Sequence, residues 1–135
     1  LYTKELNLIE NISFKGNVTN VKSFLQSSNL YLHTCYEEPF GLVILEAMAA
    51  GLPVISLDGG GNKDIITDNE NGFILDKLSE PIEFVNIIDS IMSNENKYKM
   101  LSKNGKKTAK KYDINNYIKN LLNLYNDSIS LINNL

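Results

Sequence analysis

Residues 37–51 read EEPFGLVILEAMAAG, and this stretch decides how the chain is expected to fold. Residues 42–50 are a compact run of good helix formers, which Gly51 and then Pro53 bring to an end. The run is apolar on nearly every side, so it predicts a helix inside a protein. Glu46 lies in its middle, and an ionised carboxylate there is costly unless something pairs with it. We therefore expect Glu46 to face a cleft where hydroxyl groups can donate to it.

Short apolar runs alternate with helical patterns on both sides of this stretch. Strands are expected at residues 11–15, 30–33, 53–57 and 73–75, and helices at residues 18–28, 42–50, 63–67, 81–91, 97–111 and 114–131. Strands that alternate with helices indicate an α/β fold with a parallel sheet. The sequence thus predicts a sheet of about four strands with flanking helices and a helical C-terminal tail.

The composition excludes several classes of protein. A chain of 135 residues with 43% apolar and 21% charged residues is typical of one globular domain and too short for a large multidomain enzyme. The single cysteine, Cys35, excludes a disulfide framework, and with one histidine, His33, a histidine-based metal centre or catalytic dyad is nearly excluded. A net charge of -3 gives no general attraction to nucleic acid. All thirteen basic residues are lysines, so an anion site must use Lys, hydroxyl groups or backbone N–H groups.

The residues around the start of the predicted helix form a pattern suited to a ligand. Glu38 follows the predicted strand at residues 30–33, and ligands of parallel α/β sheets bind outside the carboxyl ends of the strands. Phe40 and Gly41 place free N–H groups at a helix N-terminus, where the helix dipole favours an anion. A carboxylate, an anion site and a second carboxylate eight residues on suit a nucleotide-sugar, which has phosphates between two hydroxyl-bearing rings.

The same stretch carries a resemblance to a known family. Glu38 and Glu46, with PFGLVIL between them, resemble the E-x7-E signature of retaining glycosyltransferases of family 4, which have the GT-B fold. The likeness continues in order through ISFKGNV (12–18), AMAAGLPVI (47–55), GGNKDII (60–66) and NENGFI (69–74). It covers roughly residues 5–112 and is highly specific as a whole.

This resemblance implies a fold, an activity and a set of site residues. Residues 1–135 would be a Rossmann-like donor-binding domain, truncated at its N-terminus, with the N-terminal acceptor domain absent. Glu38 would contact the donor sugar near the reacting carbon as the catalytic residue. Donor-binding groups would be the backbone around Phe40, Gly41, Leu42 and Val43 for the diphosphate and sugar, and Glu46 for the ribose hydroxyls. The reaction would move a sugar from UDP, GDP or ADP to an acceptor with retention, with no metal ion and no cofactor.

The resemblance also implies partners and a setting. The acceptor would be a glycan or a lipid-linked molecule bound by the missing domain, in the cytoplasm or at the inner face of the plasma membrane, in bacterial surface polysaccharide synthesis. The family normally places an Arg and a Lys against the diphosphate, and the Arg is absent here. The 135 residues alone are therefore expected to be inactive. If the family's strand order is 3-2-1-4-5-6, residues 11–15 lose their neighbours, which predicts a rearranged or self-associating sheet.

Plainer interpretations stand beside these. A non-catalytic remnant that binds nucleotide-sugars or partner proteins is the main alternative, and a sugar-nucleotide epimerase is disfavoured by the signature. The turn at residues 59–61 fits a phosphate site and an ordinary turn equally well. Glu37 is expected to be a solvated loop acid, His33 a structural residue and Cys35 a small buried filler. Seven lysines between Lys97 and Lys111 favour a solvated helix face over contact with an anionic membrane.

Overall fold

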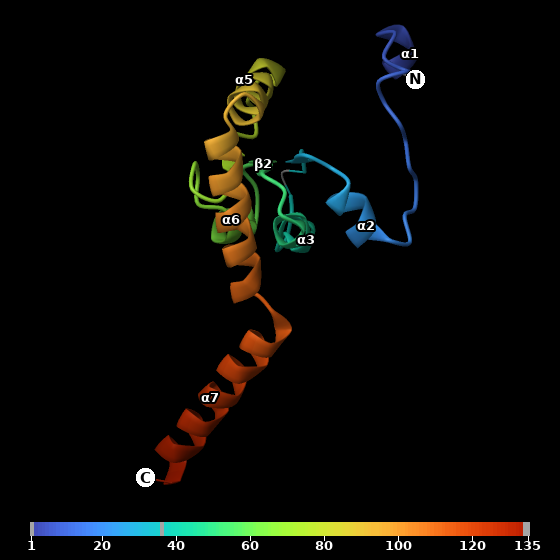
Figure 1. Cartoon of the computed structure of the whole chain (residues 1–135). Helices are drawn as coiled ribbons and strands as arrows, with labels where there is room; N and C mark the ends of the chain where they lie inside the picture. Colours follow the sequence, from blue (N-terminus) through green and yellow to red (C-terminus); the bar gives the residue numbers. More distant parts are fainter. Residues whose placement is uncertain (1, 36, 134–135) are drawn as a thin grey trace.

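A computed structural model describes residues 2–35 and 37–133 and shows a small parallel sheet between helices (Figure 1). The strands are β1 (Tyr31–His33), β2 (Val54–Leu57) and β3 (Phe73–Leu75). The helices are α1 (Tyr2–Glu5), α2 (Val21–Gln26), α3 (Leu42–Ala50), α4 (Asn62–Ile65), α5 (Pro81–Met92), α6 (Glu95–Lys111) and α7 (Ile114–Asn133). The α/β class predicted from the sequence is confirmed.

The three strands lie side by side in the order β1-β2-β3, and both pairs are parallel. Ile55 at the middle of β2 pairs with Leu32 of β1 on one side and with Phe73 of β3 on the other. Because parallel strands all end at the same edge, the loops after β1 and β2 emerge together there. This edge is where the residues of the candidate site lie.

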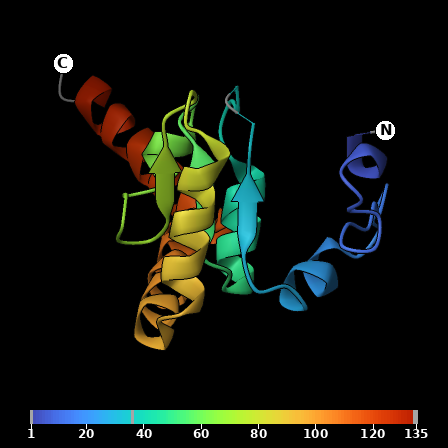
Figure 2. The same ribbon diagram turned by 90° about the horizontal axis from the view of Figure 1, so that it is seen from above.

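The alternation of side chains along β2 gives the domain two small cores. Val54 points into a cluster with buried residues of α2, α3 and the α4 region, which include Ile44 and Met48. Ile55, one residue on, points the other way, into a cluster with Ile91 of α5 and Leu101 of α6. All four residues of β2 are buried, as expected of a strand covered on both faces. Figure 2 shows the helices packed along both sides of the strands.

The prediction of a strand at residues 11–15 is wrong. This segment has no regular secondary structure and pairs with no strand of the described chain, and Phe14 is 77% exposed. No residue from 2 to 24 is buried, so the segment has no neighbouring strand to accept its backbone hydrogen bonds and no core to receive its apolar side chains. The sheet therefore has three strands instead of four, and those three keep a continuous order with no rearrangement among them.

Helix α3 is bounded by two glycines in the left-handed conformation. Gly41, with φ +96°, precedes it, and Gly51, with φ +91°, ends it and donates its amide to the carbonyls of Ala47 and Met48. Its burial differs from the expected all-round burial, because Leu42 is 63% exposed and Glu46 also lies at the surface. One stripe of α3 is thus open to a ligand while the opposite side is in the core.

The C-terminal helices extend the molecule away from the sheet. Helix α5 begins with Pro81 and a capping box between Glu80 and Glu83, and α6 packs along α3 and α5. Helix α7 projects from the end of α6 (Figure 1), and its described side chains are all at the surface or half-buried. None of the described helices has the length and apolar character that crossing a bilayer requires.

Candidate functional site

The loop that joins β1 to α3 holds the carboxylate of Glu38 at the edge of the sheet. One oxygen, Oε1, accepts a hydrogen bond from the Gly41 amide at 3.0 Å. The other, Oε2, lies 3.6 Å from Nε2 of His33, the last residue of β1. The carboxylate is half-buried and spans the end of a strand and the start of a helix. It is therefore fixed in position at the point where ligands of parallel α/β sheets bind.

The glycine turn after β2 supports this loop. The Gly61 amide donates to the Glu38 carbonyl at 2.9 Å, and a Cβ on Gly61 would lie only 2.7 Å from Cα of Phe40. Gly60 has φ +57°, and a Cβ there would overlap the Glu38 carbonyl. Of the two interpretations left open for residues 59–61, the geometry supports a structural turn that carries the neighbouring loop.

Two residues that the sequence analysis did not single out also hold the loop. The Tyr112 ring meets the Phe40 ring edge-on at 5.9 Å between centroids, and its hydroxyl donates to the Asp64 carbonyl at 2.9 Å. Asn62 is fully buried and donates from Nδ2 to the Ser56 hydroxyl and the Leu57 carbonyl. A buried asparagine directly after three glycines was a usable signal, whereas Tyr112 lies 72 residues beyond Phe40 and gave none.

The N-terminus of α3 offers donors that have no acceptor among the residues that the structure describes. The amides of Leu42 and Val43 belong to the first turn, so no carbonyl inside the helix can accept from them. Gly41 turns the chain into the helix with a conformation that favours glycine, and a Cβ there would press on Ile65 at 3.0 Å. The predicted donor-binding backbone from Phe40 to Val43 is thus gathered in one exposed turn beside Glu38.

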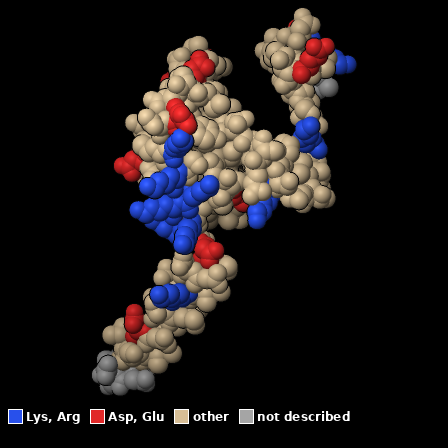
Figure 3. All heavy atoms as spheres, in the orientation of Figure 1, with Lys and Arg blue, Asp and Glu red and all other residues tan. Residues whose placement is uncertain are grey.

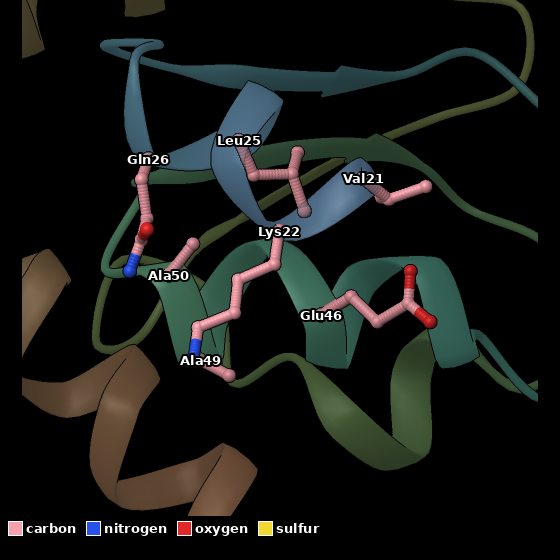
Figure 4. Close-up of a pocket in the computed structure, with 7 residues that line it drawn as sticks. All are labelled: Val21, Lys22, Leu25, Gln26, Glu46, Ala49 and Ala50. Carbon is pink, nitrogen blue, oxygen red and sulfur yellow. The ribbon is translucent and has the colours of Figure 1, made fainter. Parts of the chain in front are cut away.

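Glu46 lines a pocket of about 440 Å³ between α2 and α3 (Figure 4). The other lining residues are Val21, Lys22, Leu25 and Gln26 from α2, and Ala49 and Ala50 from α3. The Glu46 carboxylate and the Lys22 amine extend toward opposite ends of this pocket. Its volume falls in the usual range for small-molecule sites.

The charges of both predicted carboxylates affect the hydroxyl group of Tyr31 on β1. The pKa of the Tyr31 hydroxyl is raised above its ordinary value by burial first, and then by the negative charges of Glu38 and Glu46. The negative charges of both predicted acidic residues thus act on the same group of β1. Glu37, by contrast, is exposed in the loop, as expected of a solvated acid.

One side-chain cluster contradicts an expectation about Cys35. Cys35 is exposed and is not a buried filler. Its thiol, one nitrogen of the buried His33 ring and a Glu38 oxygen all lie within 4.8 Å of one another. Counting one cysteine and one histidine missed this cluster, because it depends on how close His33, Cys35 and Glu38 lie to one another after the end of β1.

The lysines of α6 form a basic surface (Figure 3). Lys99 pairs with Glu95, and Lys97 lies over the Phe73 ring and donates to the Ser90 hydroxyl. Lys106 crosses Gly51 so closely that a Cβ there would overlap its stem. Three of the seven lysines thus have local contacts, which fits a solvated helix face that also ties α6 to α3.

The fold and the site together define a class. A parallel α/β sheet with a structured acidic loop and a helix N-terminus at the carboxyl ends of its strands is a Rossmann-like ligand-binding domain. A sequence profile of the family described as glycosyl transferases group 1 matches residues 1–108. The chain therefore belongs to this family.

Individual relatives agree with this assignment. Poly(glycerol-phosphate) alpha-glucosyltransferase of Bacillus subtilis is 33% identical over 119 residues, which are 87% of this chain and 17% of the relative. The crystal structure of HepE from Anabaena in complex with UDP superposes with a TM-score of 0.85 at 26% identity, over 93% of this chain and 35% of HepE. The C-terminal domain of the group 1 protein LpcC from Francisella tularensis superposes with a TM-score of 0.71 at 26% identity, over 84% of this chain and 60% of that domain.

These matches fix the place of the chain within the family's fold. It has the fold of the C-terminal, donor-binding domain of GT-B glycosyltransferases. The chain spans only part of its curated relatives, for example 17% of the Bacillus subtilis glucosyltransferase and 33% of an uncharacterized glycosyltransferase of Haemophilus influenzae.

Proposed function

We propose that this chain is the donor-binding domain of a retaining glycosyltransferase that uses a nucleoside-diphosphate sugar. The observation that carries the proposal is that the Glu38 carboxylate accepts from the Gly41 amide at the start of α3, with Glu46 one turn beyond Leu42 on the exposed stripe of the same helix. A relative of this fold has been crystallised with UDP, and the same relative with UDP-glucose, which supports a nucleotide-sugar as the ligand class.

Each group has a role that its position suits. The unused amides of Leu42 and Val43 at the N-terminus of α3 would donate to the diphosphate and stabilise the charge that develops on it as the leaving group. Glu46 would accept from the ribose hydroxyls, because it lies one helical turn beyond Leu42 and lines the pocket between α2 and α3. Glu38 would then face the sugar. Its hydrogen bond from Gly41 orients the carboxylate, and the amide of Gly41 is released to the ligand if Glu38 turns toward the sugar.

The acceptor side of the reaction belongs to the proposal as well. We expect a separate domain to bind a glycan or lipid-linked acceptor, and we expect the enzyme to act in bacterial surface polysaccharide synthesis at the cytoplasmic side of the membrane. The 135-residue chain has no arginine, the usual bidentate partner of phosphates, so it should bind a donor without turning it over.

Calorimetric titration of UDP, GDP and ADP into the 135-residue chain tests the proposal. One of the three should bind, and Glu46→Ala should weaken that binding at least about tenfold, which corresponds to roughly 1.4 kcal/mol. The matched control is Glu37→Ala, which removes an exposed acid of the neighbouring loop and should leave the affinity unchanged. Equal affinities for the wild type and Glu46→Ala would contradict the assigned role of Glu46. Failure of all three nucleotides to bind would favour a remnant that keeps the fold and not the site.

A further inference from the structure

The end of β1 carries a cluster of three different ligating side chains. His33, Cys35 and Glu38 each offer one atom, and these atoms lie within 4.8 Å of one another. Within this cluster the His33 and Glu38 atoms are 3.6 Å apart, too far for a hydrogen bond. The three side chains come from six consecutive residues, so their approach follows from the local course of the chain after the strand.

His33 supplies an independent reason to look for a ligand here. The residue is 8% exposed, and its Nε2 atom is buried with no hydrogen-bond partner in the described chain. A buried polar atom without a partner costs free energy, so such atoms are rare in folded proteins. The ring is held in place by stacking on Tyr31 at 6.1 Å between centroids. Nε2 is therefore a buried nitrogen without a hydrogen-bond partner among the described residues, and it lies 3.6 Å from Oε2 of Glu38.

The three types of ligand atom are typical of a zinc site. An imidazole nitrogen, a thiolate and a carboxylate are the ligands that Zn²⁺ takes, and three protein ligands leave the fourth tetrahedral position open. Ligand atoms on one zinc ion lie roughly 3.3–3.8 Å apart, given bond lengths of about 2.0–2.3 Å. The His33–Glu38 separation of 3.6 Å already fits this spacing, and the exposed Cys35 side chain can rotate to close the rest.

We propose that His33, Cys35 and Glu38 form a zinc-binding site at the carboxyl end of β1. Cys35 binds as the thiolate, so its proton is released to solvent when the metal binds. The fourth position is filled by water.

The position of the site gives zinc a consequence for the donor. This step rests on the proposed function, in which Glu38 faces the donor sugar, whereas the metal site itself does not. A zinc ion bound to Glu38 withdraws the carboxylate from the sugar, so zinc and donor should weaken each other's binding by the same factor. Zinc would thus be an inhibitor and not a catalytic metal.

Cobalt provides the direct test of the site. Co²⁺ added to the 135-residue chain should give a thiolate-to-cobalt charge-transfer band that saturates at one equivalent and disappears when Zn²⁺ displaces it. Cys35→Ser should lose the band and weaken Zn²⁺ binding by more than the roughly 10- to 100-fold that changes outside the metal's own ligands cost. Circular dichroism would confirm that the variant is folded, which is expected because Cys35 is exposed. Absence of the band in the folded wild type would overturn the proposal.

Variants of two neighbouring acidic residues distinguish a specific zinc site from nonspecific binding of zinc to surface charge. Glu38→Gln should weaken Zn²⁺ binding, whereas Glu37→Gln, an exposed acid one residue away, should not. Equal losses from both variants would mean attraction to local negative charge only, and would overturn the proposal.

The consequence for the donor is measured separately. Zn²⁺ should weaken binding of UDP-, GDP- or ADP-glucose, whichever the wild type binds, and leave its binding to Cys35→Ser unchanged, so chelation of the metal by phosphate is controlled. If Cys35→Ser binds the same nucleotide-sugar but zinc has no effect on the wild type, the link to the donor fails while the zinc site stands. If no nucleotide binds while cobalt does, the proposed function fails and the zinc site remains.

Discussion

Glu38 and Gly60 are in contact across two loops, with the Glu38 carbonyl oxygen in the space that a Cβ on residue 60 would occupy. Gly60 also has φ +57°, a conformation that side chains other than glycine rarely adopt. The neighbouring Gly61 amide donates to the same carbonyl at 2.9 Å. The loop after β2 therefore sets the position of the loop after β1, and with it the position of the Glu38 carboxylate.

Replacing Gly60 should therefore disturb the site as well as the fold. Gly60→Ala adds both a strained φ and an overlap with the Glu38 carbonyl, and should lower the free energy of unfolding by about 2–4 kcal/mol. Gly16→Ala is the matched control, because Gly16 has φ +58° with nothing within 4 Å of the added carbon, and should cost at most about 1–2 kcal/mol. Urea unfolding measures both. Equal losses would show that the contact with Glu38 is unimportant.

Leu101 of α6 is a buried member of the core between the sheet and this helix. Leu101 is fully buried with Ile55, Phe73 and Ile91, so Leu101→Ala leaves a cavity and should cost about 2–5 kcal/mol. The adjacent Met100 is 40% exposed, and Met100→Ala should cost about 1 kcal/mol or less. Thermal unfolding followed by circular dichroism distinguishes the two variants. A loss for Leu101→Ala no larger than for Met100→Ala would mean that α6 does not belong to this core.

The sequence predicted correctly those parts of the fold that are determined by residues close together along the chain. The start of α3 at Leu42, its end at Gly51 and the three paired strands were predictable, because glycine, proline and short apolar runs act within a few residues. The segment at residues 11–15 has the same apolar pattern but forms no strand, since a strand needs partners for its backbone and these are supplied by other parts of a sheet.

The candidate site shows the same division. Glu38, Gly41 and Glu46 were predictable from spacing along one loop and one helix. The support from Gly60 and the ring of Tyr112 depends on which loops meet at the sheet edge, and that is decided by topology. The apolar composition of α3 predicted a helix that is buried all round, which is wrong. Its exposed stripe of Leu42 and Glu46 can be distinguished from its buried side only when the neighbouring helices are known.

Asn71 connects the turn before β3 to helix α6. It is 6% exposed, accepts from the Thr67 amide at 2.8 Å, and donates to the Ile65 carbonyl and the Thr108 hydroxyl. Asn71→Ala removes all three hydrogen bonds, one of them to the carbonyl of the buried Ile65, and should cost about 2–4 kcal/mol. Asn104→Ala is the comparison, since it removes one exposed hydrogen bond to the Glu70 carbonyl and should cost under about 1 kcal/mol. Chemical denaturation measures the free energy of unfolding of both variants and tests whether the buried Asn71 contributes more to it than Asn104.

The raised pKa of Tyr31 predicts how stability changes in alkali. Burial, followed by the charges of Glu38 and Glu46, favours the neutral phenol in the folded state. Unfolded tyrosine ionises near pH 10, so this contribution is fully present below about pH 10 and is lost as the pH rises through the higher pKa of the folded state. Tyr31→Phe cannot ionise and should lose less stability than the wild type between about pH 9 and about pH 11.

A second variant tests the cause of the Tyr31 shift. Glu46→Gln removes one of the two charges while leaving the burial of the phenol in place, so its alkaline loss should fall between those of the wild type and Tyr31→Phe. Lys63, whose pKa is raised by its hydrogen bond to Asp58 and then by the charge of that residue, adds its own alkaline loss, but it is common to all three proteins and cancels in the comparison. Melting temperatures measured across this pH range give the three curves. Parallel curves for the wild type and Tyr31→Phe would mean that the phenol does not titrate differently in the folded state, and that the two carboxylates do not act together on β1.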